Sequence, residues 1–197
     1  MDSPKKPVAI LVLAHGAGAG MTHPFMEELT SHLNESDVAV LRYQFRYMEL
    51  GSKRPDPPAI AHKAVAVALQ KANDLFPKLP VFAAGKSFGG RMSSQFLANE
   101  PIDFVRGIIF YGFPLHAPSN QLIDRADHLK QVKVPMLFLQ GTRDALADKV
   151  LIKKVSKGLK KSTLQFFEGA DHSFCAGKKV IIPELATTTV SWISNHS

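Results

Sequence analysis

The chain has 197 residues, which suits one domain, and its composition (45% hydrophobic, 21% charged) is that of an ordinary globular protein. Its single cysteine excludes an internal disulfide framework and a cysteine-rich zinc site, and no apolar run approaches the roughly 18 residues that a membrane span needs. The formal net charge of +7 raises the question of an anionic partner.

The first apolar run imitates a secretory signal but is better interpreted as a buried strand. Lys5 and Lys6 precede the run 8–14, and small residues follow it. The run is at the lower length limit for the apolar part of a signal, and it leads directly into the glycine-rich segment 15–20. We therefore expect a cytoplasmic protein whose first strand covers residues 8–14.

Short apolar runs then alternate with helix-like segments. The runs are apolar throughout, which is typical of parallel strands covered on both faces. The predicted strands are 8–14, 38–45, 81–84, Val105–Tyr111, 135–140 and 163–167. Helical spacing of apolar residues predicts helices over 25–33, 61–75, Phe88–Asn99, 148–159 and 183–193, the second after a start signal at Asp56 and Pro57. This order predicts a single α/β domain over 1–197, with a mainly parallel sheet of about six strands and helices on both faces.

A G-x-S-x-G motif lies between the third predicted strand and the helix after it, as Gly85-Lys86-Ser87-Phe88-Gly89. This is the setting of a nucleophile elbow, a turn so tight that glycine is needed at both flanks. The pattern alone should arise by chance in very roughly one chain in fifteen of this length. The position of the motif between a strand and a helix is therefore the main evidence for a nucleophile elbow.

Two further polar residues follow later strands. Asp144 comes after the strand 135–140, and His172 comes after the strand 163–167. Ligands bind at the carboxyl ends of the strands in such sheets, so we expect Ser87, Asp144 and His172 to meet there. In a Ser-His-Asp triad of this chain order, the imidazole takes the serine proton and the carboxylate fixes the tautomer. A capping serine, a turn aspartate and a surface histidine are each plausible alone, but the three together favour a triad.

The loop after the first strand, His15-Gly16-Ala17-Gly18, is where a second oxyanion donor belongs. We expect the backbone N–H groups of Ala17 and Phe88 to form the oxyanion hole. A dinucleotide fingerprint is the competing interpretation, but the spacing is G-x-G-x-G, and the second strand ends without the acid that binds ribose. The elbow also lacks the upstream glycine of a phosphate-binding P-loop.

With these motifs the chain resembles a compact α/β hydrolase related to the dienelactone hydrolases, and most of all the bacterial hydrolases similar to testis-expressed protein 30 and subunit 3 of the NSL complex. The resemblance rests on the segments 13–18, 45–49, 54–58, 85–92, 111–116, 141–144 and 169–174. Dienelactone hydrolases proper use cysteine where this chain has Ser87, so their substrate is not carried over. Some members of the narrower family look like scaffold subunits, which leaves a non-catalytic interaction module as the alternative function.

Several other residues could have either a functional or a structural role. Six lysines recur at near-helical spacing without interleaved aromatic residues, so we expect a solvated helix face and no nucleic-acid partner; they are Lys149, Lys153, Lys154, Lys157, Lys160 and Lys161. Arg42, Arg46, Lys53 and Arg54 could attract an anionic acyl group but are more typical of solvated loop cations. His116 could line the site or be structural, and Cys175 is expected to be a small buried apolar residue.

The sequence thus predicts a serine hydrolase that cleaves small carboxylic esters through Ser87, His172 and Asp144 and an acyl-enzyme, with a thioester or an amide as the alternative bond. Only about twenty residues separate Pro114 from Val134, which leaves no room for a lid domain. We expect a crossover helix over 122–132 and a short loop, 115–120, that roofs the site. The expected partner is a small-molecule ester, without cofactor, metal or membrane, and the sequence does not indicate the oligomeric state.

Overall fold

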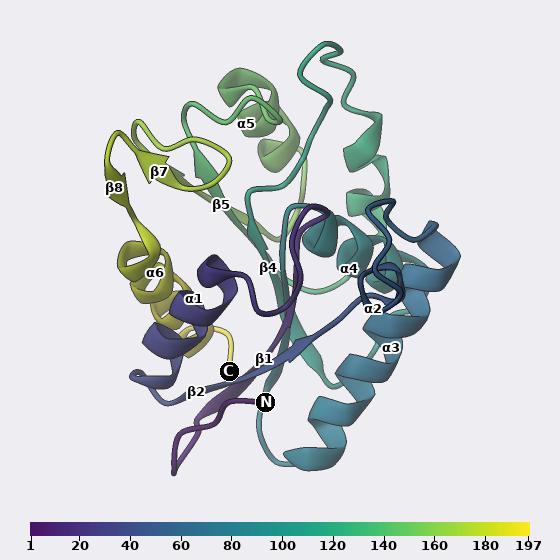
Figure 1. Cartoon of the computed structure of the whole chain (residues 1–197), viewed down its shortest axis with the longest axis vertical. Coiled ribbons are helices and arrows are strands. Elements are labelled where there is room, and N and C mark those ends of the chain that lie inside the picture. Colours follow the sequence, from purple (N-terminus) through teal and green to yellow (C-terminus); the bar gives the residue numbers. More distant parts are fainter.

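The computed structural model describes residues 1–197, and its centre is a six-stranded sheet in the order β2-β1-β3-β4-β5-β6 (Figure 1). The strands are β1 (Ala9–Ala14), β2 (Val38–Tyr43), β3 (Val81–Lys86), β4 (Val105–Tyr111), β5 (Met136–Gly141) and β6 (Ser162–Phe167). All neighbouring strands in this sheet are parallel. A separate two-stranded antiparallel hairpin consists of β7 (Cys175–Ala176) and β8 (Lys179–Val180).

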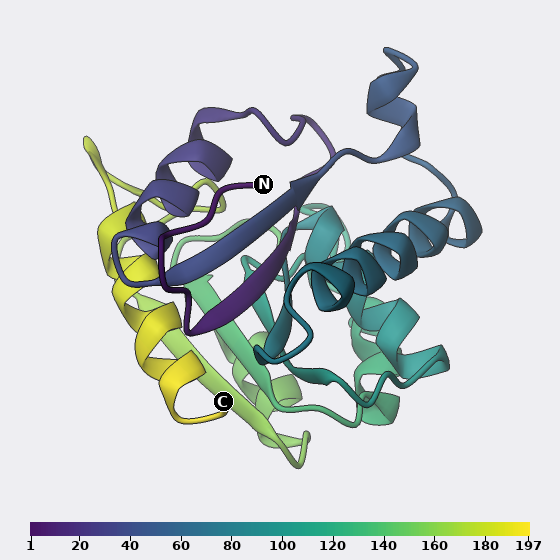
Figure 2. The same cartoon turned by 90° about the horizontal axis from the view of Figure 1, so that it is seen from below.

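Helices cover both faces of the sheet, which is why its strands are apolar throughout. The helices are α1 (Pro24–Asn34), α2 (Arg46–Glu49), α3 (Pro58–Leu75), α4 (Phe88–Asn99), the 3-10 helix η1 (Asp124–Gln131), α5 (Lys149–Lys157) and α6 (Ile182–Ser194). Figure 2 shows α1 and α6 together on one face, and α3 and α4 on the other. Side chains of β1 alternate between these layers: Leu11 packs in the core with α1 and α6, and Val12 in the core with α3 and α4.

The predicted fold class is confirmed, since the sheet has six parallel strands, both faces are covered by helices, and no lid domain is inserted. Val105–Tyr111 and Phe88–Asn99 have the predicted bounds, and the ends of the other strands differ by at most two residues. Helix α2 and the hairpin of β7 and β8 were not predicted.

The predicted crossover helix over 122–132 is present and slightly shorter, as the 3-10 helix η1. Its buried residues agree with this type of helix. Ala126, Leu129 and Val132 are buried at a spacing of three, which matches the three residues per turn of a 3-10 helix. The remaining residues of η1 are mostly polar, and several of them are exposed.

The run that imitates a secretory signal is β1, and it lies inside the sheet between β2 and β3. Every residue of β1 is buried. The run is therefore an integral part of the hydrophobic core. None of the helices combines the length and the apolar character that crossing a bilayer requires.

Candidate active site

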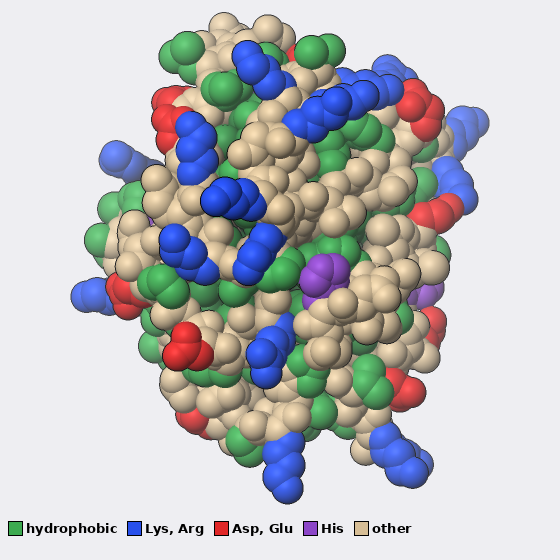
Figure 3. Space-filling view, turned by 180° about the vertical axis from the view of Figure 1, so that it is seen from behind, with side chains coloured by type: hydrophobic (Ala, Val, Ile, Leu, Met, Phe, Trp, Pro, Cys, Tyr) green, Lys and Arg blue, Asp and Glu red, His purple; other side chains and the backbone are tan.

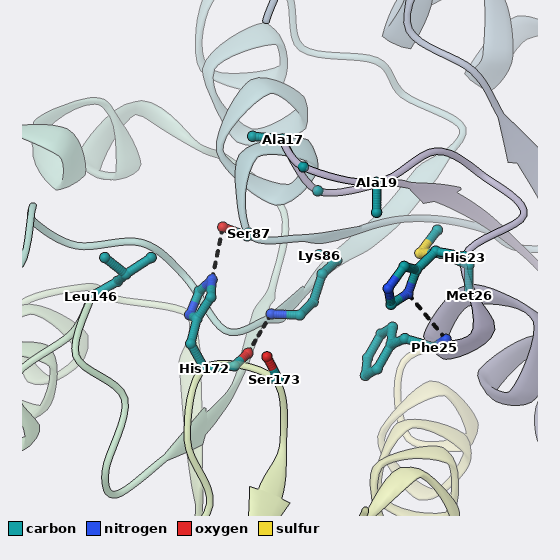
Figure 4. A pocket seen from close by; sticks show the side chains of 12 residues that line it. Ala17, Ala19, His23, Phe25, Met26, Lys86, Ser87, Leu146, His172 and Ser173 are labelled. Atoms are coloured by element: carbon teal, nitrogen blue, oxygen red, sulfur yellow. Dashed lines mark hydrogen bonds between the residues drawn. The ribbon is translucent and has the colours of Figure 1, made fainter. Parts of the chain in front are cut away.

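The three predicted triad residues lie together at the carboxyl edge of the sheet. Ser87 follows β3, Asp144 follows β5, and His172 lies in the loop between β6 and β7. The Nε2 atom of His172 is 2.9 Å from Ser87 Oγ (Figure 4). Its Nδ1 atom is 2.7 Å from Asp144 Oδ2. The side chains thus form one hydrogen-bonded line across three neighbouring loops.

The turn that holds Ser87 depends on its flanking glycines. Ser87 has φ 49° and ψ −113°, a backbone conformation that is strained for a residue with a Cβ. A Cβ at Gly85 would lie 2.2 Å from the backbone nitrogen of Gly90, and one at Gly89 would lie 2.6 Å from the carbonyl oxygen of His15. Glycine at both positions therefore lets the start of α4 approach β3 and the first loop closely.

Asp144 is fixed by three donors. Its side chain is completely buried. Besides His172 Nδ1, the Nε2 group of Gln140 donates to Oδ2 at 2.5 Å, and the N–H of Leu146 donates to Oδ1 at 2.8 Å. Gln140 is in turn fixed, because its Oε1 accepts from the N–H of Phe113 at 3.0 Å. An ionised carboxylate only accepts hydrogen bonds, so this arrangement puts the imidazole proton on Nδ1 and leaves Nε2 free to accept from Ser87.

The loop after β1 brings the predicted oxyanion donors to Ser87. Ala17 lines the same cavity as Ser87, and a Cβ at Gly16 would lie 3.9 Å from Ser87 Cβ. Phe88 follows Ser87 and is the first residue of α4, where N–H groups have no partner within the helix. The backbone N–H groups of Ala17 and Phe88 donate to no other protein atom. Both are therefore free to donate to a ligand oxygen.

Two buried side chains hold that loop in place. His15 Nδ1 lies 2.8 Å from the carbonyl oxygen of Gly16, and its Nε2 accepts from the N–H of Phe45 at 3.0 Å. Burial lowers the pKa of His15, in agreement with a neutral ring that donates from Nδ1. The hydroxyl of Tyr47 donates to the carbonyl oxygen of Ala17 at 2.8 Å, and burial raises its pKa to about 12. These two roles were not predicted from the sequence.

A cavity of about 430 Å³ opens in front of Ser87 (Figure 4). The loop 16–19 and the residues at the start of α1 form one wall, Leu146 lies opposite, and Lys86 and His172 line the space between them. Phe25 and Met26 make the α1 side apolar. No group of three or more His, Cys, Asp or Glu side chains lies close enough together to hold a metal ion.

The prediction that the loop 115–120 roofs the site is wrong, because none of its residues lines this cavity. Leu115 and His116 are buried instead. His116 Nε2 accepts from the N–H of Asp148 at 2.8 Å, which ties the loop to the start of α5. Its Nδ1 lies 2.9 Å from the carbonyl oxygen of Ala117. His116 is therefore a structural residue, the second of the two roles considered for it.

The predicted loop cations do not reach the cavity either. Arg42 is not a solvated cation, since its guanidinium donates to the carbonyl oxygen of Met21 at 2.9 Å and to Asp2 at 3.1 Å. It also lies 3.5 Å from a carboxylate oxygen of Glu27. The other three are absent from the cavity lining and exposed, as solvated cations are: Arg46, Lys53 and Arg54.

The six lysines in and after α5 are all exposed, as predicted. Figure 3 shows Lys and Arg side chains scattered over the back of the molecule, with uncharged surface between them. Lys149 lies 3.6 Å from Glu168. Cys175 is half-buried in β7, so it is more accessible than predicted.

Known proteins match this chain over nearly its whole length. A family model described as an alpha/beta hydrolase domain matches residues 7–185. A dienelactone hydrolase from Anabaena variabilis has a TM-score of 0.79 at 19% identity, covering 98% of this chain and 89% of that one. An α/β serine hydrolase homologue from Coxiella burnetii has a TM-score of 0.79 at 19% identity, covering 97% and 88%.

An α/β serine hydrolase without a lid from Xanthomonas campestris has a TM-score of 0.76 at 20% identity, covering 98% of this chain and 86% of that one. At these identities the structures share the fold. The narrower resemblance to hydrolases similar to testis-expressed protein 30 stays a prediction.

Proposed function

Because the chain belongs to the alpha/beta hydrolase family, we propose that it is a serine hydrolase that cleaves small carboxylic esters through an acyl-enzyme. One observation carries the proposal. The hydrogen-bonded line from Ser87 through His172 to Asp144 is unbroken, at 2.9 and 2.7 Å, and its Ser87 end lies in a cavity of about 430 Å³. A serine hydroxyl is a weak nucleophile until a neighbouring base takes its proton, and this geometry supplies that base.

The acylation step follows from the positions of these atoms. Ser87 Oγ forms a bond to the ester carbonyl carbon while its proton moves to Nε2 of His172. The carbonyl electron pair moves onto oxygen, and the free N–H groups of Ala17 and Phe88 stabilise the resulting oxyanion. Asp144 stabilises the imidazolium through Nδ1. When the C–O bond to the alcohol breaks, Nε2 returns the proton to the leaving oxygen.

Deacylation repeats these events with water as the nucleophile. His172 Nε2 takes a proton from the water, whose oxygen bonds to the acyl carbon, and then protonates Ser87 Oγ as the acid departs. These reaction steps need no cofactor, since every proton that moves is held by this chain, the substrate or water.

A serine-reactive fluorophosphonate probe and a panel of ester substrates test the proposal. The unchanged protein should be labelled rapidly and hydrolyse short esters, whereas Ser87→Ala should do neither. Ser93→Ala is a matched control, because Ser93 lies further along α4, six residues after Ser87, and is buried away from the cavity. Absence of labelling and of hydrolysis in the folded unchanged protein would favour the non-catalytic interaction module.

We further propose that residues 1–197 act as one domain and that the protein is cytoplasmic. The second proposal is supported by β1, since cleavage after a signal at this position would remove a strand from the interior of the sheet. A fusion to a reporter active only after export tests it, with no reporter activity expected.

A further inference from the structure

Lys86 is a cation in the candidate active site that has no carboxylate partner. Its side chain reaches between His172 and Phe25 in the cavity (Figure 4). The ammonium donates to the backbone carbonyl oxygen of His172 at 2.5 Å. No Asp or Glu oxygen lies within 4.0 Å of it, whereas Arg42 and Lys149 both have such partners.

The surroundings of this ammonium make the missing partner significant. Nζ lies 5.8 Å from the ring centre of Phe25 and 5.3 Å from that of Phe174, so aromatic rings replace much of its water. Burial lowers the pKa of Lys86 to about 8, although the charges of Asp144 and Asp171 act in the opposite direction. An ammonium has three N–H donors, and only one of them has a protein acceptor here.

The ammonium also lies next to the catalytic line. Its Nζ and the His172 ring atoms Cε1 and Nδ1 are 3.3, 3.4 and 3.4 Å from a single point, the position that a Cβ at Gly112 would occupy. The titratable groups that face it are Asp144, Asp171 and His172 from the loops after β5 and β6, and His23, which lines the cavity from the side of α1. Any charged group on a substrate that enters the cavity therefore meets a positive charge close to Ser87.

We propose that Lys86 is a specificity-determining residue that selects esters bearing a carboxylate. This inference rests on the proposed function and names the substrate class of the same site. A substrate carboxylate would accept the unused N–H donors and supply the ion pair that the protein leaves open. A charge-assisted hydrogen bond in a half-buried site is stronger than one in water, so selectivity for the anion follows.

The test uses pairs of esters that have the same shape and differ in charge. Mono-4-nitrophenyl glutarate and 4-nitrophenyl 5-methylhexanoate place either a carboxylate or an isopropyl group at the end of the acyl chain. On the alcohol side, 4-acetoxybenzoate and 4-acetylphenyl acetate place either a carboxylate or a methyl ketone of the same shape on the ring. In one of the two pairs, kcat/KM should favour the anion by at least about tenfold, the size expected for a hydrogen bond to a charged group.

Variants of Lys86 separate selectivity from a structural role. Lys86→Met should lower the anion-to-neutral ratio of kcat/KM by about tenfold or more, and Lys86→Arg should keep most of it. Any general loss from a displaced His172 loop affects both esters and cancels in the ratio. Lys153→Met removes the same charge from an exposed position on α5 and should leave the ratio unchanged. A ratio that Lys86→Met does not alter would overturn the proposal and leave Lys86 as a positioning residue.

A binding measurement distinguishes failure of this inference from failure of the proposed function. Glutarate should shift NMR signals around the cavity of Ser87→Ala, and adding Lys86→Met should abolish that shift. If the unchanged protein hydrolyses no ester but this binding depends on Lys86, the anion site stands and the hydrolase proposal fails. If neutral esters are hydrolysed while neither pair shows selectivity and glutarate does not bind, the hydrolase proposal stands and the anion site fails.

Discussion

Replacing Asp144 by Asn tests whether the structure holds His172 in the tautomer that can accept the serine proton. Asp144 Oδ2 faces two donors, at 2.7 Å from His172 Nδ1 and 2.5 Å from Gln140 Nε2. Its Oδ1 accepts from the N–H of Leu146. If the single oxygen of Asn stays with Leu146, the amide NH2 faces the imidazole, and Nδ1 must become an acceptor. Nε2 then carries the proton and cannot take another from Ser87.

The opposite orientation of the Asn amide is also unfavourable, because it places the NH2 group against the N–H of Leu146. An unpaired buried donor costs about 1–3 kcal/mol. In a serine protease triad, the wrong tautomer lowers kcat about ten-thousandfold, which is about 5.5 kcal/mol of transition-state stabilisation. We expect a loss of this order in kcat/KM for 4-nitrophenyl acetate with Asp144→Asn.

Asp171→Asn is the matched control for this variant. The Asp171 carboxylate accepts from the N–H groups of Ser173 and Cys175 through a single oxygen, which Asn retains. The activity of Asp171→Asn on a neutral ester should stay close to that of the unchanged protein. If Asp144→Asn is folded by circular dichroism and keeps its activity within tenfold, the reasoning about the tautomer is refuted.

The serine and the histidine share one proton transfer, so Ser87→Ala and His172→Ala should each lower kcat/KM by several orders of magnitude. The double variant should lose little more activity than either single variant. Multiplicative losses would contradict a shared mechanism. A cavity of about 430 Å³ without a lid buries few methylenes, each contributing about 0.8 kcal/mol, so kcat/KM for 4-nitrophenyl esters from acetate to palmitate should peak at short chains; a maximum at long chains would require an acyl tunnel. Gly85→Ala should lower the free energy of unfolding in urea by about 3 kcal/mol or more, since its Cβ would lie 2.2 Å from a backbone nitrogen. Gly18→Ala, which meets no atom within 4 Å, should change it little. The Lys86 ammonium, with a pKa of about 8, is charged below that pH and neutral above it, so the preference for an anionic ester should fall between about pH 7 and pH 9; a constant preference over this range would separate it from the charge of Lys86.

The triad could be predicted because topology alone brings its members together. Parallel strands place all their carboxyl ends at one edge of the sheet, and Ser87, Asp144 and His172 each follow a strand. The approximate strand limits are enough for this argument, since it needs only the order of the elements. A shift of two residues at the end of β3 or β2 does not move a loop to the other edge.

The residues that hold the triad could not be found in this way. Gln140 is one polar residue at the end of an apolar strand, and its two partners are Asp144 and the N–H of Phe113, which lies 27 positions away in the chain. His15 and Tyr47 fix the oxyanion loop through backbone carbonyl and N–H groups. A backbone group has no sequence signature, so contacts of this kind follow only from the folded chain.

The path of the loop 115–120 was predicted wrongly for the same reason. The segment 115–120 has a length suited to a roof, but the hydrogen bond from the N–H of Asp148 to His116 turns it toward α5. The wall of the cavity is formed instead by the loop 16–19 and the start of α1. The length of a loop limits how much of a site it can cover. Its path is decided by contacts with residues that are distant in the sequence.

The residue before the serine is less constrained than the rest of the elbow. Steric contacts require glycine at positions 85 and 89, and the reaction requires a nucleophile at position 87, but the turn itself accepts any side chain at position 86. That side chain nevertheless enters the cavity, and here it also bonds to the carbonyl oxygen of His172. Selectivity and the placement of the histidine loop are therefore linked at one residue. A variant of Lys86 should change the ratio between substrates through its charge and the common rate through His172, and these two effects are separable only when both are measured.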